Sequence, residues 1–483
     1  MGYYVIGIGG TGAKCVEALT HLCSSGMMPD GELYTLFVDP DGANGNLERS
    51  QITLQQYVNC KQLKFGKTDL FKTTITIAKP DVWSPFGESK PSLSDFFNYI
   101  TLKVSKPEVA NLFDVLYTPA EKETALNKGF RGHPSIGAAV MAETVDFVKG
   151  EPWNTFRNKI ATDVKSGQKT KVFLIGSIFG GTGAAGFPTI ARLIHDVFKQ
   201  KKTEVGKAQE SSGGLEIGGA LLLPYFSFIP EGEDKELRAS SEDFLMSTKA
   251  SLKYYYQKKY NEIFTTIYLL GDEDLSPVKK FSIGSNTQKN EPHFIELYAA
   301  LAAINFFNTD GLTDYQMIAR EELKTIKWGD LPDSNFLKPR LGRLAGAAFA
   351  YLSVYHPILK DISANGKGYR APWFIDYDFF KSGISIEDGG VKWIKDYCEG
   401  FVSWLTNIHT SAKGQNIELF NWNAFTGMTL TDFGNLVLPI KKKGDSDTLG
   451  SLWEYLCYEK VNDPESIGFG KFIRNLYDGC EII

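Results

Sequence analysis

The chain has 483 residues, enough for two or three domains that each have a core of their own. Hydrophobic residues make up 43% of it and charged residues 23%, as in an ordinary globular protein. The formal net charge of −5 gives no general attraction to nucleic acid or to an anionic membrane, so we expect no nucleic-acid partner.

The expected compartment is the cytoplasm. The six cysteines are scattered without paired spacing, which favours reduced thiols. The first residues pass directly from a short apolar run into glycines, unlike a signal peptide. The longest apolar stretch, residues 294–307, is too short to cross a bilayer and contains Glu296, so we expect a buried helix and no transmembrane segment.

The first part of the chain alternates between strand and helix patterns. Residues 3–8 and 34–38 are apolar runs, and a helical pattern lies between them. Further buried strands are expected at 171–176, 217–223 and 265–270. This alternation predicts an α/β fold with a doubly wound, mostly parallel sheet over about the first 310 residues.

The rest of the chain divides less clearly. Residues 42–128 are mixed and are interpreted as an insertion between core strands, and residues 201–216 as a polar surface loop. After about residue 335 the pattern is largely helical. We therefore expect a nucleotide-binding domain over 1–308 that includes the buried helix, a connecting acidic loop over 309–335, and a C-terminal domain over 336–483.

Three glycine-rich loops stand before predicted helices. Glycine lets the backbone approach a phosphate closely, and the N–H groups at a helix start point toward the anion. No GxxxxGK[ST] motif occurs, so this is not a P-loop protein. The residues concerned are Gly9, Gly10, Thr11 and Gly12 in the first loop, Arg131, Gly132 and His133 in the second along the chain, and Gly180, Gly181, Thr182 and Gly183 in the third.

Other interpretations of these loops stay open. Gly9 to Gly12 alone also fit a tight turn without ligand, or a dinucleotide site in which Asp39 binds a ribose. The latter predicts an NAD-dependent oxidoreductase but leaves the loop at 180–183 without a role. His133 either contacts the ligand or only shapes its loop.

Four segments resemble the nucleotide-binding loops of the tubulin/FtsZ superfamily. They read GGTGAAGFP at 180–188, FVDPDGANGN at 37–46, RGHPSIGAA at 131–139 and LPYFSFIPEG at 223–232. Their layout, over roughly residues 1–350, is most similar to that of divergent bacterial tubulin-like proteins. The resemblance implies GTP or GDP with Mg²⁺, held by the three glycine loops, by Asp39 and Asp41 after the second strand, and by Glu231. No metal site made by direct side-chain coordination is predicted.

The resemblance also supplies candidates for catalysis and base recognition. In this superfamily an acidic loop after the central helix reaches the nucleotide of the neighbouring subunit, from the end opposite to the glycine loops. Asp330 and Asp333 have the matching DxxD spacing, but they also fit solvated loop acids or a helix cap. Asn290 and Glu296, together with the turn 272–274, are the candidates for the base, and each also fits a cap or a surface acid.

The function expected from the resemblance is a GTPase that assembles with itself head to tail into filaments and hydrolyses GTP at the subunit interface. The alternative is a nucleotide-binding scaffold or sensor that hydrolyses poorly, in membrane remodelling or phage defence. The aromatic-rich stretch 373–380 predicts either core or a protein interface in the C-terminal region.

Overall fold

The fold is described from a computed structural model of the chain. It describes residues 1–86, 91–123, 125–126, 129–130, 133–199, 214–227, 241–272, 275–277, 285–312, 314–316, 325–365, 369–379, 384–411, 416–427, 430–438 and 448–482. Most of the predicted surface loop 201–216 therefore lies outside the described residues.

A parallel sheet forms the centre of the molecule. In the described part of the chain it has seven strands in the order β3-β2-β1-β4-β5-β7-β9, and every neighbouring pair is parallel. The strands are β1 (Gly2–Ile8), β2 (Glu32–Val38), β3 (Thr74–Trp83), β4 (Thr170–Ser177), β5 (Leu215–Leu222), β7 (Thr266–Leu270) and β9 (Asp314–Gln316). The central strands β1 and β4 are buried along their whole length, which explains why they read as continuous apolar runs. The predicted α/β class and its parallel sheet are confirmed.

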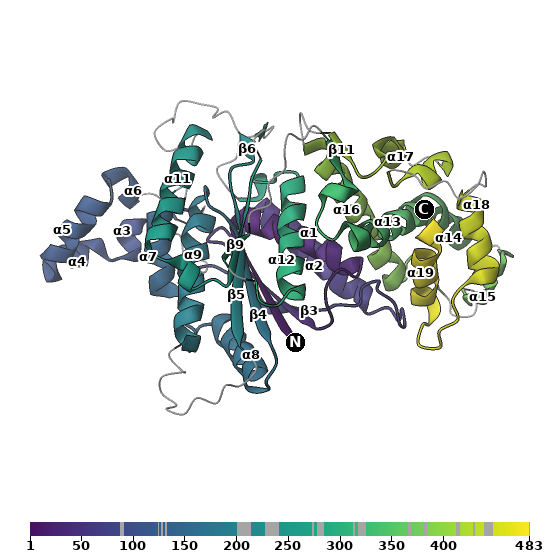
Figure 1. Ribbon diagram of the computed structural model, residues 1–483, viewed down its shortest axis with the longest axis horizontal. Helices are drawn as coiled ribbons and strands as arrows, with labels where there is room; N and C mark the ends of the chain where they lie inside the picture. The colour runs from purple at the N-terminus through teal and green to yellow at the C-terminus, as the bar shows by residue number, and fades with distance from the viewer. Residues whose placement is uncertain are drawn as a thin grey trace.

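Helices cover both faces of this sheet (Figure 1). One face carries α1 (Gly9–Ser24) and α12 (Phe294–Asn308), and α2 (Gly45–Lys61) packs on α1. The other face carries α8 (Trp153–Lys165) and α9 (Gly181–Lys199), with α7 (Pro134–Thr144) packed on α9; α11 (Ser241–Gln257) lies on the same side. Neighbouring side chains of β1 show the two faces, because Tyr3 contacts Phe307 of α12 and Tyr4 contacts Phe156 of α8.

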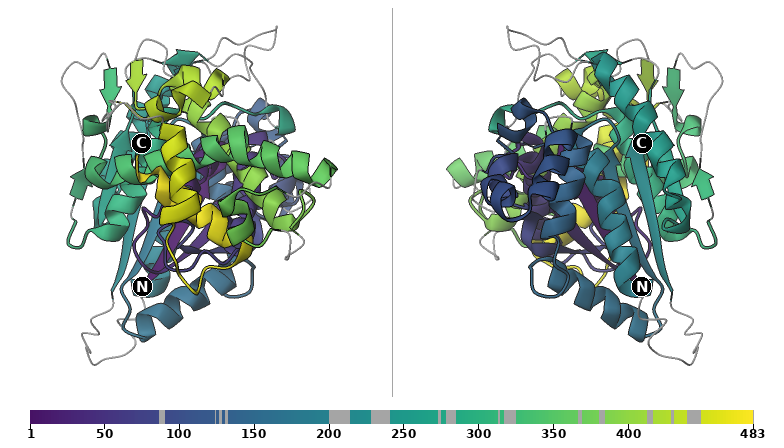
Figure 2. Two further views of the ribbon diagram at one scale, coloured as in Figure 1. Left: turned by 90° about the vertical axis from the view of Figure 1, so that its right-hand side faces the viewer. Right: turned by 90° about the vertical axis from the view of Figure 1, so that its left-hand side faces the viewer.

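The C-terminal part is largely helical, with one short strand, β11 (Asn416–Glu418), that pairs with β10 (Thr325–Lys327), and it packs beyond α1 and α2 (Figure 2, left). The ring of His21 on α1 lies against Tyr397, Phe401 and Trp404 of α16, and burial lowers its pKa to about 3. One hydrophobic cluster runs from Tyr3 to Cys480, so the two parts share their core. The helices are α13 (Ser334–Ala350), α14 (His356–Asn365), α15 (Pro372–Asp376), α16 (Gly389–Ser411), α17 (Trp422–Gly427), α18 (Thr448–Glu454) and α19 (Gly468–Gly479).

The helix predicted over 294–307 is confirmed as α12, which is buried along nearly its whole length. It runs antiparallel to the strands. Its first turn lies beside α1, where Glu296 pairs with Lys14. Its last carbonyls, those of Phe306 and of Thr309 just beyond the helix, accept hydrogen bonds from Lys171 at the start of β4.

The stretch 42–128 is part of the core as well as an insertion. It contains α2, which begins where the Asn44 side chain caps the Asn46 N–H, and the edge strand β3. Only the second half is inserted, as a small helical cluster beyond α7. Its helices are α3 (Leu93–Phe96), α4 (Tyr99–Ser105), α5 (Pro107–Leu116) and α6 (Pro119–Glu123).

No helix among the described residues has both the length and the apolar character needed to cross a membrane. The six cysteines are all buried and unpaired.

Candidate functional site

The candidate site lies where the strand order changes direction. From β1 the chain builds the sheet outward through β2 and β3, and from β4 it builds outward the other way through β5, β7 and β9. In open parallel sheets a crevice forms outside the carboxyl ends of the strands at such a point, and ligands bind there. Gly9 to Gly12 follow β1 and Gly180 to Gly183 follow β4, so both predicted loops stand at this crevice.

The three glycine loops converge on Thr182. A Cβ atom built on Gly9 would lie 3.4 Å from the Cβ of Thr182, and one built on Gly129 would lie 3.7 Å from its Oγ1. Gly9 has φ +71° and Gly129 φ +78°, values that favour glycine. The structure thus brings together loops from three separate parts of the chain, at Gly9, Gly129 and Thr182. Gly10, Thr11, Gly180 and Thr182 are partly exposed there.

Two helices, α1 and α9, begin at this switch point, so their positive ends lie there. Neither α1 nor α9 has an acidic residue in its first turn, and Ile8 at the start of α1 makes no side-chain cap. The first N–H groups of a helix have no partner within the helix, and its dipole places a partial positive charge there. Two such ends side by side form a site for an anion.

Gly12 and Gly183 have a packing role in these loops. A Cβ on Gly12 would lie 2.4 Å from the carbonyl oxygen of Ile175, and one on Gly183 would lie 2.5 Å from that of Ser177. These glycines let the helices approach the strands closely. Gly180 is different, because a Cβ there would meet only the Oγ of Ser177, at 2.8 Å.

Asp39 and Asp41 follow β2 at the same edge of the sheet. Asp39 is 3% exposed and its carboxylate accepts a hydrogen bond of 3.0 Å from the N–H of Asp41. Burial raises the pKa of Asp39 to about 8, so the group is largely protonated at neutral pH. Asp41 is 5% exposed and accepts from the N–H of Ala43 at 3.3 Å.

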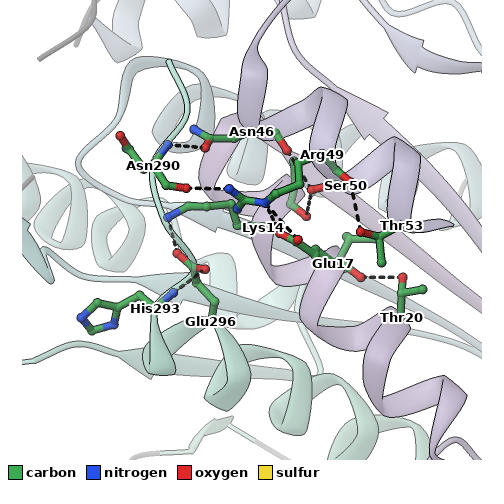
Figure 3. A network of polar contacts seen from close by, with 12 residues as sticks. Lys14, Glu17, Thr20, Asn46, Arg49, Ser50, Thr53, Asn290, His293 and Glu296 are labelled. Carbon is green, nitrogen blue, oxygen red and sulfur yellow. Dashed lines mark hydrogen bonds and ion pairs between the residues drawn. The ribbon is translucent and has the colours of Figure 1, made fainter. Parts of the chain in front are cut away.

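Asn290 is held near the first loop through its backbone (Figure 3). Its N–H donates to Asn46 Oδ1 at 2.8 Å, and its carbonyl accepts from Arg49 at 2.8 Å. Arg49 also pairs with Glu17 of α1. On the other side, the Asn44 amide would lie 3.1 Å from a Cβ on Gly10. The structure therefore brings the predicted Asn290 beside the residues that flank the first loop.

The Glu296 carboxylate is bonded to other residues of the chain. It is 1% exposed and forms an ion pair with Lys14, which is 3% exposed. Tyr225 donates to its Oε1 at 2.7 Å, and the N–H of His293 donates to its Oε2 at 3.0 Å. Glu296 thus caps the start of α12 in a capping box, which was the alternative considered for it.

His293 is a neutral part of this network. Burial, followed by the charge of Lys14, lowers its pKa to about 3. Its Nδ1 accepts from the N–H of Ile295 at 3.2 Å, so Nε2 carries the proton and donates to Ser276 at 2.9 Å.

The structure describes only some of the remaining predicted binding residues. His133 stands at the start of α7, with its Nδ1 2.9 Å from Glu121 of α6. The predicted residues Arg131, Gly132 and Glu231 lie outside the described residues, as do Glu273 and Asp274 of the turn 272–274.

The acidic pair Asp330 and Asp333 lies beside the first half of α12, where the hydroxyl of Tyr298 donates to the carbonyl of Asp330 at 3.3 Å. One Asp330 carboxylate oxygen accepts from the N–H of Lys327 at 2.8 Å. Asp333 is exposed, has φ +51° and precedes α13 without making a side-chain cap. The pair is therefore not at the C-terminal end of α12, which is where the family resemblance implied an acidic loop.

Asp310 occupies that end instead, and the sequence analysis missed it. Its carboxylate is 3.2 Å from Lys171 and 2.5 Å from Lys169, the residues that begin β4, and it is 56% exposed. Hydrogen bonds from Lys169 and Lys171 lower its pKa. β4 runs from these lysines to the glycine loops. Asp310 and the loops therefore lie at opposite ends of the strands, roughly 25 Å apart along β4. The signal available was its place directly after the buried helix.

Asn44 and Tyr225 were also missed. Asn44 faces Gly10, and Tyr225 is hydrogen-bonded to Thr11 and Glu296. Both stand in segments that the resemblance covers, but the contacts that mark them are tertiary.

No group of three or more His, Cys, Asp or Glu side chains within the described ranges could hold a metal ion. Fold and site together define a parallel α/β protein in which two glycine-rich loops, each at the start of a helix, lie side by side at the switch point of its sheet. No model of a known protein family matches the chain, and no curated protein matches it.

Proposed function

We propose that this protein binds a nucleoside triphosphate, GTP by the resemblance to tubulin and FtsZ, at the crevice between β1 and β4. The observation that carries the proposal is the meeting of two helix starts, α1 and α9, at contacting glycine loops; neither has an acidic residue in its first turn, and α1 has no side-chain cap. A single such loop serves the pyrophosphate of a dinucleotide, whereas two loops beside each other suit a chain of phosphates held from both sides.

Different residues around this site would contact the phosphates, the sugar and the base. The N–H groups at the starts of α1 and α9 would face the phosphates, and the hydroxyl of the partly exposed Thr182 would add a donor. Gly129, which begins the remaining loop, lies beside Thr182 on a third side of the site. Asn44, whose amide donates to Gln288, and Asn290, held by Asn46 and Arg49, lie on the side of Gly10 where the sugar and base would extend.

Asp39 and Asp41 fit a Mg²⁺ ion that arrives with the phosphates. Carboxylate oxygens are the ligands that Mg²⁺ prefers, usually with several waters retained. Among the described residues, the buried and largely protonated carboxyl of Asp39 accepts one hydrogen bond, from the N–H of Asp41, and a cation would draw it to the ionised form. Mg²⁺, when bound, neutralises charge on the phosphate oxygens.

Hydrolysis would be completed by an acid from a second copy that stacks head to tail. Asp310 is the acid that the geometry favours for this role, since it is half-exposed and lies at the edge of the sheet opposite the glycine loops. Asp333 remains the alternative that the DxxD spacing indicates. In either case the carboxylate would orient the attacking water on the neighbour's nucleotide.

Binding is tested with Gly180→Val. The added side chain projects into the loop, where it meets only a hydroxyl group, so we expect a folded protein with GTP affinity lowered at least about tenfold. Calorimetric titration of GTP, GDP and NAD measures this, and the mass of any nucleotide that copurifies identifies the natural ligand. Gly400→Val, on the exposed side of α16, is the control and should bind as the wild type does.

Unchanged GTP affinity in Gly180→Val would remove the loop from the site. Tight binding of NAD in place of GTP would favour the oxidoreductase interpretation, and GTP binding without turnover would favour the scaffold or sensor.

A further inference from the structure

The helical cluster beyond α7 carries the largest gathering of exposed apolar side chains on consecutive elements in the described structure. It projects from the body at one end of the long axis (Figure 1) and stands in front of the sheet when viewed from that end (Figure 2, right). Its helices α4 and α5 form a hairpin. The exposed side chains, with their exposed fractions, are Ile100 (82%), Val104 (84%), Val109 (40%), Leu112 (56%), Val115 (83%) and Leu116 (59%).

The hairpin already has an inner core, and these residues are not part of it. Phe113 of α5 packs against Phe97 and Tyr99, with ring centroids 5.8 and 5.1 Å apart, and against Tyr117 at 4.9 Å. Val109, Leu112 and Leu116 follow the spacing of a second helix face, and Ile100 and Val104 are one turn apart on α4. A helix with two apolar faces is stable in water only when both are covered.

We propose that a second copy of this chain covers this face, so that two α4–α5 hairpins pack into a four-helix bundle around a two-fold axis. Six side chains with this exposure make a patch of about 600 Å², and two such patches bury on the order of 1,200 Å², the lower limit for a stable interface. This contact is independent of the nucleotide site and different from the head-to-tail contact of the proposed function.

The charges on the hairpin favour a second copy over a lipid surface. Lys103 and Lys106 stand at the α4 side and Glu108 on α5, all exposed; Asp114 of α5 is also exposed but is already paired with Lys122 and Tyr99 of its own copy, so Glu108 is the acid available to the lysines of a second copy. Two-fold packing that sets α4 of one copy on α5 of the other brings lysines opposite acids, as self-complementary pairs. The same balance leaves no net charge to attract anionic headgroups, which bind through clusters of basic residues.

The test is the mass of the full chain by sedimentation velocity without added nucleotide. We expect a dimer at micromolar concentration and at least about tenfold weaker dimerisation in the double variant Leu112→Asp, Val115→Asp, with an unchanged melting temperature because both positions are exposed. Val148→Asp, at an equally exposed valine outside the hairpin (61%), should dimerise as the wild type does. Gly180→Val should also dimerise normally, which separates this contact from nucleotide binding.

A second measurement locates the contact. All six natural cysteines are buried, so Leu112→Cys offers a single accessible thiol near the proposed axis. Under mild oxidation it should cross-link to itself, whereas Val148→Cys should not. A monomer at every concentration, a dimer that persists in the double aspartate variant, or hairpin-dependent flotation with phosphatidylserine vesicles in place of dimerisation would each overturn the proposal.

Discussion

At the scale of single residues, Asp39 is a buried acid in the loop that follows β2. Its carboxyl is nearly inaccessible and receives one hydrogen bond, from the N–H of Asp41, so burial outweighs that bond and raises its pKa from 3.8 to about 8. A structural acid would be expected to have a compensating cation within the fold. In the part of the chain that the structure describes, no lysine or arginine pairs with Asp39, an arrangement suited to a cation that comes with a ligand.

The shift makes a prediction about pH and stability. Between about pH 4 and 8 the unfolded chain has Asp39 ionised while the folded chain holds its proton, so folding takes up a proton and stability falls as pH rises. Asp39→Asn removes this dependence. We expect the variant to melt close to the wild type at pH 5 and at a higher temperature than the wild type at pH 8.

The measurement is a series of thermal melts from pH 5 to pH 8 without nucleotide. Asp361→Asn, a substitution of the same kind on α14, is the control and should leave the wild-type pH profile unchanged. A gap between Asp39→Asn and wild type that is constant across pH would show that Asp39 is ionised in the folded protein.

At the scale of elements, α1 and α12 are joined by a buried ion pair rather than by apolar packing alone. Lys14 and Glu296 are almost fully buried, and Tyr225 links the pair to Thr11 in the first glycine loop. The network therefore connects the start of the central helix to a residue that would face the phosphates.

Breaking this pair from one side should be costly. Glu296→Gln leaves the Lys14 ammonium buried without its counter-charge, and such losses amount to about 3–5 kcal/mol. The double variant Lys14→Met, Glu296→Gln should be more stable than the single one, because no unpaired charge remains. Chemical denaturation midpoints compare the two, and Glu399→Gln, in the exposed pair with Lys395, should cost less than about 1 kcal/mol.

The elements also show what sequence can and cannot predict. β1, β4 and β5 were predictable because a strand buried on both faces is a continuous apolar run. β3 was not, because it is an edge strand with exposed positions and contains Lys79-Pro80-Asp81. The glycine loops were predictable because their signal is local. The contacts of Asn44 with Gly10 and of Asp310 with Lys171 were not, because they join residues that only the tertiary fold brings together.

At the scale of the whole molecule, the direction of α12 decides which acid could act on a neighbour. The helix begins beside α1 near the glycine loops and ends at Lys171 on the opposite edge of the sheet. Asp310 follows that end directly, whereas Asp330 lies beside Tyr298 in the first half of the helix. Head-to-tail stacking would bring the Asp310 edge of one copy to the loop edge of the next.

Two variants test this arrangement: one removes the acid at one end of the strands, and the other blocks the glycine loop at the opposite end. Asp310→Asn should bind GTP as the wild type does but hydrolyse it roughly 10²–10⁴-fold more slowly, the loss typical of a group that positions water. Gly180→Val should fail to bind. Mixed together, the two can form interfaces with an intact Asp310 on one side and an intact loop on the other, so some hydrolysis should return, and wild-type turnover per subunit should rise with protein concentration.

Asp333→Asn is the matched variant, because Asn keeps the left-handed backbone at this position and removes only the charge. If Asp333 rather than Asp310 serves the neighbour, the losses and the recovery will follow Asp333→Asn instead. A melting curve for Asp310→Asn tests whether the lost activity comes from a less stable fold. We expect a melting temperature close to that of the wild type, because Lys171 keeps its bonds to the carbonyls of Phe306 and Thr309. If turnover does not depend on protein concentration and neither mixture recovers activity, each subunit completes its own site. Nucleotide binding at the glycine loops would then remain, and the mechanism shared between subunits would be wrong.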